Sequence, residues 1–516
     1  MRIMSLLLLL LTVVSCQQES DALVPYDHAD VITFGRAENS FAEKFKVFRD
    51  GMSQNYALWD YERECGVNWD EHCDSMLPKF EELDKRPGGV MDFELEELME
   101  EMVRPLHDGH LAVYFTNHKT GNRVMARPSD LWIKNRDDYF TESLEKYMFL
   151  LMPYQNTGDE SEILEDYSAS TSQDVLMYDA TSMNGKVQRF LSKEIERLME
   201  LVTPTETETR KLQDYRHLSD ELAQLSSQTG VQQVNSYNNI VLKYAYLNVP
   251  GLERISPSFA SKGMSITYAL FKGNIAYLYL SSFSLSDYID PAMFAKMTDM
   301  NGRNLVLARQ IKTAWSMWFN KIQELHAAGK LGGVIIDLRN NGGGYSTDFQ
   351  YVLGALLPSG GYNVGYLRFK RGTGRYDYSP LMLQNMATYS GEHAVINEPV
   401  AVLVNSFSAS MSEVTSRGAQ LMPNARVIGK RTWGAFCVLD ENSGFSYNYS
   451  GNIGVQDVTP VFARVPLVST LTMDGRQEEG QGLTPDIEVN LNRELFVSQQ
   501  ADTQLDRALE YIRTGK

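Results

Sequence analysis

Three features are scarce in this 516-residue chain: cysteine, excess positive charge and long apolar segments. Four cysteines are too few for a disulfide-built scaffold, whereas a hydrophobic fraction of 43% is typical of a chain that buries an ordinary core. The formal net charge of −18 argues against the basic surface that nucleic-acid binding requires. After the first sixteen residues, no segment is long and apolar enough to cross a membrane. The composition therefore indicates an acidic enzyme or binding protein without a nucleic-acid partner.

The N-terminal stretch MRIMSLLLLLLTVVSC has a short apolar run after Arg2, which is typical of an export signal. The small residue before Cys16 resembles a bacterial lipobox, which implies cleavage before Cys16 and lipidation of its thiol. Gln17 at the next position favours the outer membrane, on its periplasmic or cell-surface face. The alternative is an ordinary secretory peptide in which Cys16 is incidental. We expect residues 1–16 to be a lipoprotein signal peptide and residues 17–36 a tether.

The other cysteines allow one disulfide. Export permits disulfides, and Cys65 with Cys73 is the expected pair. His72 adds a third potential ligand beside them, but the spacing matches no zinc motif, so we expect no metal.

The remaining chain divides by pattern into four parts. Residues 37–118 are predicted to form a helical domain, because Phe41, Phe45 and Phe48 make one apolar stripe. Residues 119–258 are a middle region, either a helical insertion or a degenerate PDZ-like domain. Residues 259–500 alternate strands and helices, which predicts an α/β fold class for this core. Residues 501–516 are predicted to be a C-terminal helix.

One chemistry-bearing stretch is VIIDLRNNGGGYSTDF. Gly342, Gly343 and Gly344 follow a predicted strand, where backbone N–H groups without side chains can point at a developing oxyanion. Such a donor contributes about 3–4 kcal/mol in catalysis. A tight turn without function is the alternative. The glycine spacing fits neither phosphate-binding motif, so no nucleotide is expected. Asp337 and Arg339 in the same stretch are expected to form a structural ion pair.

The second stretch is NSFSASMSEV, with serines at positions 406, 408, 410 and 412. A strand over 399–404 is predicted to run through this turn into a helix over about 411–420. The turn then lies at a helix N-terminus, where N–H groups favour negative charge. The alternative is that the serines only cap the helix and form the turn.

Four ordered motifs, DLRNNGGG, SxSxSE, VIGxxTxG and GxGLTPDIEV, resemble the tail-specific or C-terminal processing serine peptidases. The chain is more similar to the tricorn and interphotoreceptor-retinoid-binding-protein-like branch than to the Ser/Lys branch. The resemblance implies a crotonase-like ββα spiral core. Its nucleophile is the serine three residues before the motif's glutamate, which here is Ser410 because of Glu413. Its oxyanion hole would use the N–H of Met411 and one of the amides of Gly342, Gly343 and Gly344.

The same resemblance leaves the proton acceptor open. The Ser/Lys branch has a lysine where this chain has Ala435, and Lys430 is the remaining lysine candidate. The tricorn-like branch uses a histidine at the end of the helical domain, which implies His110, with His107 as the alternative.

A supporting carboxylate is implied as well. Glu479 aligns with the glutamate of that branch, and Glu478 is adjacent. Gly109 stands where tricorn has a serine, so water or a direct contact would have to replace that hydroxyl.

The expected function is therefore an exported, lipid-anchored serine endopeptidase that cleaves polypeptides through an acyl-enzyme and needs no cofactor. The alternative is a catalytically inactive peptide- or ligand-binding protein with the same fold. Trp433 either lines the substrate site or, as the sequence favours, packs in the core. The sequence does not define the oligomeric state.

Overall fold

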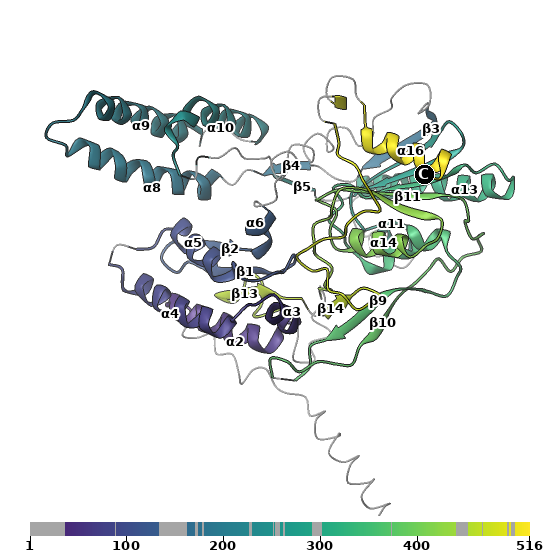
Figure 1. Ribbon diagram of the computed structural model, residues 1–516, viewed down its shortest axis with the longest axis horizontal. Helices are drawn as coiled ribbons and strands as arrows, with labels where there is room; N and C mark the ends of the chain where they lie inside the picture. The colour runs from purple at the N-terminus through teal and green to yellow at the C-terminus, as the bar shows by residue number, and fades with distance from the viewer. Residues whose placement is uncertain are drawn as a thin grey trace, which may run out of the picture.

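The computed structural model of the chain is drawn in Figure 1. It describes residues 37–133 except 88, 163–170, 174–177, 180–225, 230–250, 252, 258–261, 264–290, 302–439 except 373, 452–492 except 467, 495–496 and 501–516. The expected signal peptide, Cys16 and the tether lie outside these residues. Within them, no helix combines the length and apolarity needed to span a membrane.

The N-terminal unit is helical, with α2 (Phe41–Asn55), α3 (Trp59–Glu64), α4 (Trp69–Lys85) and α5 (Asp92–Val103). Two of its helices begin at polar caps: Ser40 accepts from the N–H of Glu43, and Asn68 accepts from that of Glu71. The predicted stripe of three phenylalanines on α2 is fully buried. This apolar face holds the helices together.

The same unit extends past the expected boundary at residue 118. Strand β1 (Ala112–Thr116) pairs antiparallel with β2 (Arg123–Ala126), which is followed by α6 (Pro128–Ile133). The other edge of β1 pairs antiparallel with β13 (Val461–Arg464), and Ile453 packs in the same core. A segment close to the C-terminus therefore completes the N-terminal unit and holds the strand that follows His110.

The expected disulfide is wrong, because both cysteines are free. Cys73 on α4 is buried in the helical core, whereas Cys65, after α3, is exposed. Closeness in sequence does not bring the thiols together because the two side chains point into different environments. Among the described residues, no three His, Cys, Asp or Glu side chains are grouped so that they could hold a metal ion.

A seven-stranded sheet forms the second unit, in the order β15-β12-β11-β8-β7-β6-β3. Neighbours from β15 to β7 run parallel, while β6 and β3 pair antiparallel. Their bounds are β3 (Ile163–Ser170), β6 (Ser265–Phe271), β7 (Ile275–Leu280), β8 (Gly333–Asp337), β11 (Val400–Val404), β12 (Ala425–Gly429) and β15 (Ile487–Glu488). The α/β expectation is confirmed as a mixed fold with a helical N-terminal region and a sheet core. One strand, β3, comes from the expected middle region.

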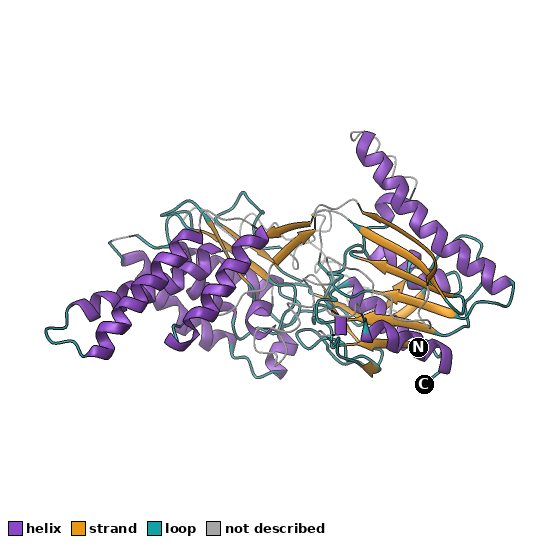
Figure 2. Ribbon diagram, turned by 90° about the horizontal axis from the view of Figure 1, so that it is seen from above, coloured by secondary structure: helices purple, strands orange, loops and turns teal. Residues whose placement is uncertain are grey.

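Helices cover both faces of this sheet. One face packs on α11 (Ser286–Ile289), α13 (Gly302–Ala327) and α14 (Met411–Gln420), with the 3₁₀ turns η6 (Ser346–Tyr351) and η7 (Leu353–Leu356). The other face packs on α16 (Thr503–Thr514). On β8, Val334 and Ile336 face the first layer and Ile335 the second, which explains its uninterrupted apolar run. Figure 2 shows the sheet at one end of the molecule.

A buried ion-pair network attaches α16 to the sheet. The expected pair is confirmed: Arg339 Nη2 lies 2.6 Å from Asp337 Oδ2. The same guanidinium also contacts Asp502, the N-cap of α16, at 2.8 Å. Tyr277 donates to Asp337 at 2.8 Å. All three charged side chains are fully buried, so this network has a structural role away from solvent.

The described remainder forms two smaller elements. A three-stranded sheet has the order β10-β9-β14, with β9 (Tyr362–Phe369), β10 (Met382–Met386) and β14 (Val468–Leu471). The middle region contributes α8 (Ala180–Met199), α9 (Glu206–Gln224), α10 (Gly230–Tyr244), η5 (Ala245–Leu247), and the pair β4 (Asp174–Met177) and β5 (Ser258–Ser261). These three helices share a core of their own and project away from the sheet (Figure 1).

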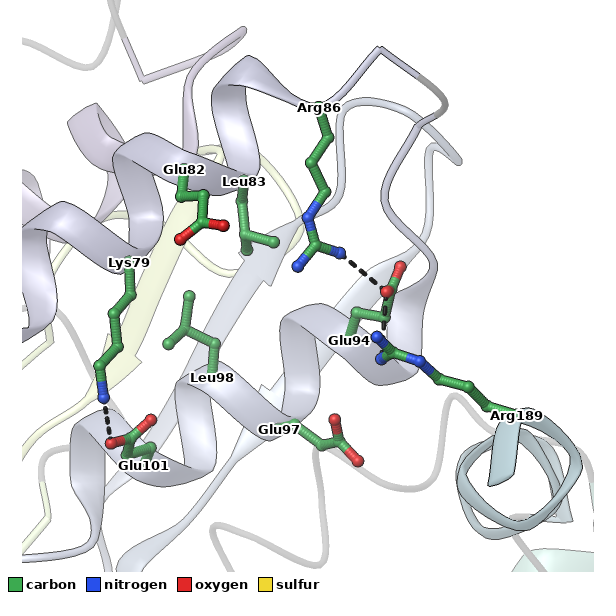
Figure 3. Close-up of a pocket in the computed structure, with 9 residues that line it drawn as sticks. All are labelled: Lys79, Glu82, Leu83, Arg86, Glu94, Glu97, Leu98, Glu101 and Arg189. Carbon is green, nitrogen blue, oxygen red and sulfur yellow. Dashed lines mark hydrogen bonds and ion pairs between the residues drawn. The ribbon is translucent and has the colours of Figure 1, made fainter. Parts of the chain in front are cut away.

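The projecting helices touch the N-terminal unit beside a polar pocket of about 280 Å³ between α4, α5 and α8. Glu94 pairs there with Arg86 at 2.8 Å and with Arg189 of α8 at 3.1 Å (Figure 3). None of the predicted site residues lines this pocket. Its contacts join two units of the fold.

Candidate active site

The turn between β11 and α14 presents one of its four serines to solvent. Ser408 and Ser412 are buried, and their hydroxyls donate to the carbonyls of Leu338 and Asn341 at 2.8 and 2.7 Å. Ser406 is buried too, with no hydrogen-bond partner for its hydroxyl in the described part of the chain. Ser410 is partly exposed. Of the four serines in this turn, Ser410 is therefore the one that reaches solvent.

Ser410 has a strained backbone. Its φ of 56° and ψ of −118° lie outside the regions that residues with a side chain favour. Such a conformation costs about 1–3 kcal/mol and is typical of functional turns. Ser410 is also the N-cap of α14, so the N–H of Met411 begins the helix without an intrahelical acceptor. A nucleophile here would lie next to an available N–H donor.

The glycine loop after β8 lies against this turn. A Cβ on Gly343, which has φ of 93°, would come within 2.5 Å of Ser410 Cβ and 2.8 Å of Met411 N, so no larger residue fits. Gly343 is buried and donates its own N–H to Asn341 Oδ1 at 2.8 Å. Gly342 and Gly344 are exposed. Gly343 therefore sets the close approach, and its own N–H is already occupied.

Glu413 has a structural role that the sequence did not indicate. Its buried carboxylate accepts from the N–H of Ser410 at 3.0 Å and from the amides of Gly434 and Ala435, both at 2.7 Å. The Thr432 hydroxyl donates to it as well, at 2.6 Å. Burial raises the pKa of Glu413 to about 7, while these donors favour the ionised form. Glu413 ties the serine turn to the loop over residues 430–437.

The loop over residues 430–437 also contains the position at which the Ser/Lys branch has its lysine. Ala435, at the lysine position of the Ser/Lys branch, is buried and uses its backbone rather than a side chain. Lys430 is buried directly after β12.

His110, the histidine that the resemblance implies as the proton acceptor, lies on the loop that precedes β1. Asp108 shapes this loop, because its Oδ1 accepts from the N–H groups of His110 and Leu111, both at 2.7 Å. Burial and the nearby Arg464 lower the pKa of His110 to about 3. The imidazole is therefore neutral at pH 7.

Glu479 is placed to orient this histidine. Its Oε1 lies 3.9 Å from His110 Nδ1, which has no hydrogen-bond partner in the described residues. The same oxygen accepts from the N–H of Gly109 at 2.8 Å, and Oε2 accepts from those of Phe436 and Cys437 at 2.6 and 2.7 Å. The carboxylate is rigidly held, and a small movement of the imidazole would close the hydrogen bond.

The electrostatic environment of Glu479 is unusual. Burial, followed by the charge of Asp108, raises the pKa of Glu479 well above its ordinary value. Burial also raises the pKa of Asp108 to about 7. Three backbone donors to Glu479 oppose this effect, because they favour the ionised carboxylate.

Gly109 shows how the serine of the tricorn-like pattern is replaced. A Cβ there would come within 2.3 Å of the Gly434 carbonyl oxygen and 2.8 Å of Ala435 Cβ. The loop therefore has no room for a relay hydroxyl, and Gly109 contacts Glu479 through its backbone N–H alone.

Gly109→Ser is accordingly expected to impair the protein rather than restore a relay. The new side chain must push the 107–110 loop away from the 430–437 loop, and we expect peptide turnover to fall by about 10²-fold, as displacements near 1 Å do. Initial-rate assays with thermal melting measure the effect; Ala328→Ser, at an exposed position after α13, is the control. Activity at or above that of the parent would contradict this packing argument.

The alternative histidine has a different partner. His107 Nδ1 lies 2.9 Å from Glu62 Oε2, and the contact raises the pKa of His107. Its backbone N–H donates to the other oxygen of the same carboxylate at 2.8 Å. His107 thus fastens the start of the loop to α3.

The serine turn and the histidine loop meet at the loop over residues 430–437. Gly434 and Ala435 bind Glu413 on the serine side and pack against Gly109 on the histidine side. Trp433 spans the same junction, because its N–H donates to the Ser408 carbonyl at 3.0 Å and its indole N–H to the Gly109 carbonyl at 3.3 Å. The structure therefore gathers Ser410, His110 and Glu479 around one loop.

A comparison with solved structures finds three proteins that match this chain over part or most of its length. A candidate peptidase from Parabacteroides merdae is 16% identical, covers 92% of this chain and 98% of its own, and has a TM-score of 0.48. Mature CPAF complexed with lactacystin is 10% identical over 93% and 100%, with a TM-score of 0.47. The tricorn protease is 17% identical over 47% of this chain and 18% of its own, with a TM-score of 0.28.

A match in sequence assigns the core more directly. Residues 274–489 fit the pattern of peptidase family S41. This range contains β7 to β15, the glycine loop, the Ser410 turn and Glu479. This core, which is less than half of the chain, therefore carries the pattern of peptidase family S41, and the protein is a serine-type peptidase.

Proposed function

We propose that this protein is an exported, lipid-anchored endopeptidase that cleaves polypeptides through an acyl-enzyme at Ser410. One observation carries the assignment: Ser410 is the partly exposed serine of a strained turn, between the Met411 N–H and the glycine loop. An exposed hydroxyl beside backbone donors is the arrangement that acyl transfer requires.

In the first half of the reaction, the Ser410 hydroxyl oxygen attacks the scissile carbonyl carbon and its proton passes to His110. His110 Nδ1 faces Glu479, so Nε2 is the nitrogen that takes the proton. The carbonyl oxygen becomes an oxyanion, held by the N–H of Met411 and that of Gly342 or Gly344. His110 then gives the proton to the leaving amine as the C–N bond breaks, and an ester remains on Ser410.

Water completes the cycle. His110 removes a proton from water as the water oxygen attacks the ester carbon, and it returns that proton to the Ser410 oxygen when the C–O bond breaks. Glu479 stabilises the imidazolium in both halves. A neutral resting imidazole suits this order of steps, because both begin with proton uptake.

Covalent labelling tests the proposal. A fluorophosphonate probe is expected to add one mass increment to the protein, and peptide mapping should place it on Ser410. Heat-denatured protein is the control, since an ordinary serine hydroxyl does not react. No adduct on protein of native circular dichroism would reject an acyl-enzyme at Ser410 and favour the inactive ligand-binding alternative.

The membrane anchor is a separate part of the proposal. It is supported by the apolar run that ends at Ser15–Cys16. Cys16→Ser is expected to release the protein from the membrane fraction of a bacterial host, with Cys65→Ser as the control that keeps it there. Membrane retention of the Cys16 variant would show that lipidation at this position is not the anchor.

A further inference from the structure

The surface around Ser410 that reaches solvent is apolar. From 405 to 412, the partly exposed residues are Phe407, Ala409 and Ser410, while the intervening polar side chains are buried. From 432 to 437, Trp433 is the partly exposed residue. A polypeptide that presents its scissile carbonyl to Ser410 must therefore place neighbouring side chains near these aromatic rings.

Trp433 is held in this position from both sides. Its backbone donates to the Ser408 carbonyl, and its indole donates to the Gly109 carbonyl next to His110. Its ring lies 6.2 Å from that of Phe407, at an interplanar angle of 43°. One backbone contact and one indole contact therefore hold Trp433, so its position depends on both loops.

The charges nearby add a second preference. The carboxylates of Glu413 and Glu479 are fully buried and occupied by backbone donors, so they offer nothing to a substrate. The charged side chains that reach solvent on the adjoining segments 431–437 and 461–464 are Arg431 and Arg464. Arg464 pairs in register with Ala112, two residues after His110. A basic substrate side chain that approaches these two guanidinium groups would meet like charge.

We infer that Phe407 and Trp433 form the wall of a substrate subsite for a large apolar side chain beside the scissile bond, and that basic side chains are excluded from it. This inference rests on the proposed endopeptidase function and adds a substrate class to it. Apolar side chains gain by burial against the two rings, acidic ones lose their hydration, and basic ones also meet the two arginines.

Cleavage-site profiling tests the subsite. The purified protein is incubated with a library of peptides from a digested proteome, and new termini are identified by mass spectrometry, with Ser410→Ala protein as the blank. Phe, Leu, Tyr or Met should be enriched on one side of the cut, and Lys and Arg depleted there. A profile without apolar enrichment on either side would overturn the inference, while continued Ser410 labelling would leave the peptidase proposal intact.

Variants then assign the preference to the two rings. For a pair of fluorogenic peptides that differ by Phe or Ala at the selected position, Trp433→Ala and Phe407→Ala should each lower the Phe/Ala ratio of kcat/KM by about 10-fold, the scale of apolar-pocket discrimination. Trp433→Phe, which keeps a ring but loses the indole N–H, should preserve most of the ratio. If both alanine variants slow the two peptides equally, the rings only position the loops and the subsite assignment is wrong.

Discussion

Ser410→Ala is expected to lower kcat for peptide cleavage by about 10⁴-fold or more, because the residual rate of such variants comes from binding and the oxyanion donors alone. The loss should lie in kcat, since the hydroxyl makes its bond in the transition state rather than in the bound substrate. Steady-state assays on a fluorogenic peptide, with unchanged thermal melting, measure it.

The neighbouring serine supplies the control for this experiment. Ser406 is in the same turn, but it is buried and its hydroxyl has no hydrogen-bond partner in the described residues. Ser406→Ala should therefore keep kcat within about twofold of the parent, as expected for a change that removes no pairing. Turnover by Ser410→Ala within tenfold of the parent would place the nucleophile elsewhere.

His110→Asn is expected to produce the second largest loss, about 10³-fold in kcat, because general base catalysis contributes on the order of 10²–10⁴. The substitution keeps the backbone N–H that donates to Asp108, and the native imidazole makes no hydrogen bond through Nδ1, so the loop should retain its shape. The loss is measured at pH 7.5, together with circular dichroism and melting.

Two matched variants separate the candidate bases. His107→Asn disrupts the contact with Glu62 and should cost stability more than kcat. Lys430→Met tests the remaining lysine. Retained activity in His110→Asn combined with a collapse in Lys430→Met would overturn the histidine assignment in favour of a Ser/Lys pair.

The elements around the nucleophile follow from local patterns. The helix expected over about 411–420 is α14, and the strand expected over 399–404 is β11 (Val400–Val404). A buried parallel strand has a continuous apolar run, and a helix N-terminus attracts serine, so short-range chemistry decides both. Gly343 is likewise explained by its close approach to Ser410.

The site's supporting contacts could not be predicted in that way. Glu413 marked the serine in the motif, yet nothing local indicates that its carboxylate binds amides of the 430–437 loop. The sequence likewise gives no sign of the role of Asp108, whose carboxylate accepts a hydrogen bond from the N–H of His110. Such contacts depend on which loops lie side by side in the folded protein. That arrangement is determined by the pairing of all the strands in the sheet.

By itself, the sequence determined the α/β core and the strand, turn and helix around the serines, because strand, turn and helix propensities act over a few residues. It indicated Ser410 among those serines only through the motif resemblance. Only the tertiary structure decided that β13 returns to pair with β1, that Cys65 and Cys73 stay apart, and that Gly109 leaves no room for a side chain. These outcomes depend on pairing and packing between residues far apart in the chain, whose stabilisation comes from burial in a shared core. His110 and Glu479 are neighbours for that reason. Pairing between distant strands brings their two loops together, and nothing in the sequence of either loop indicates this contact.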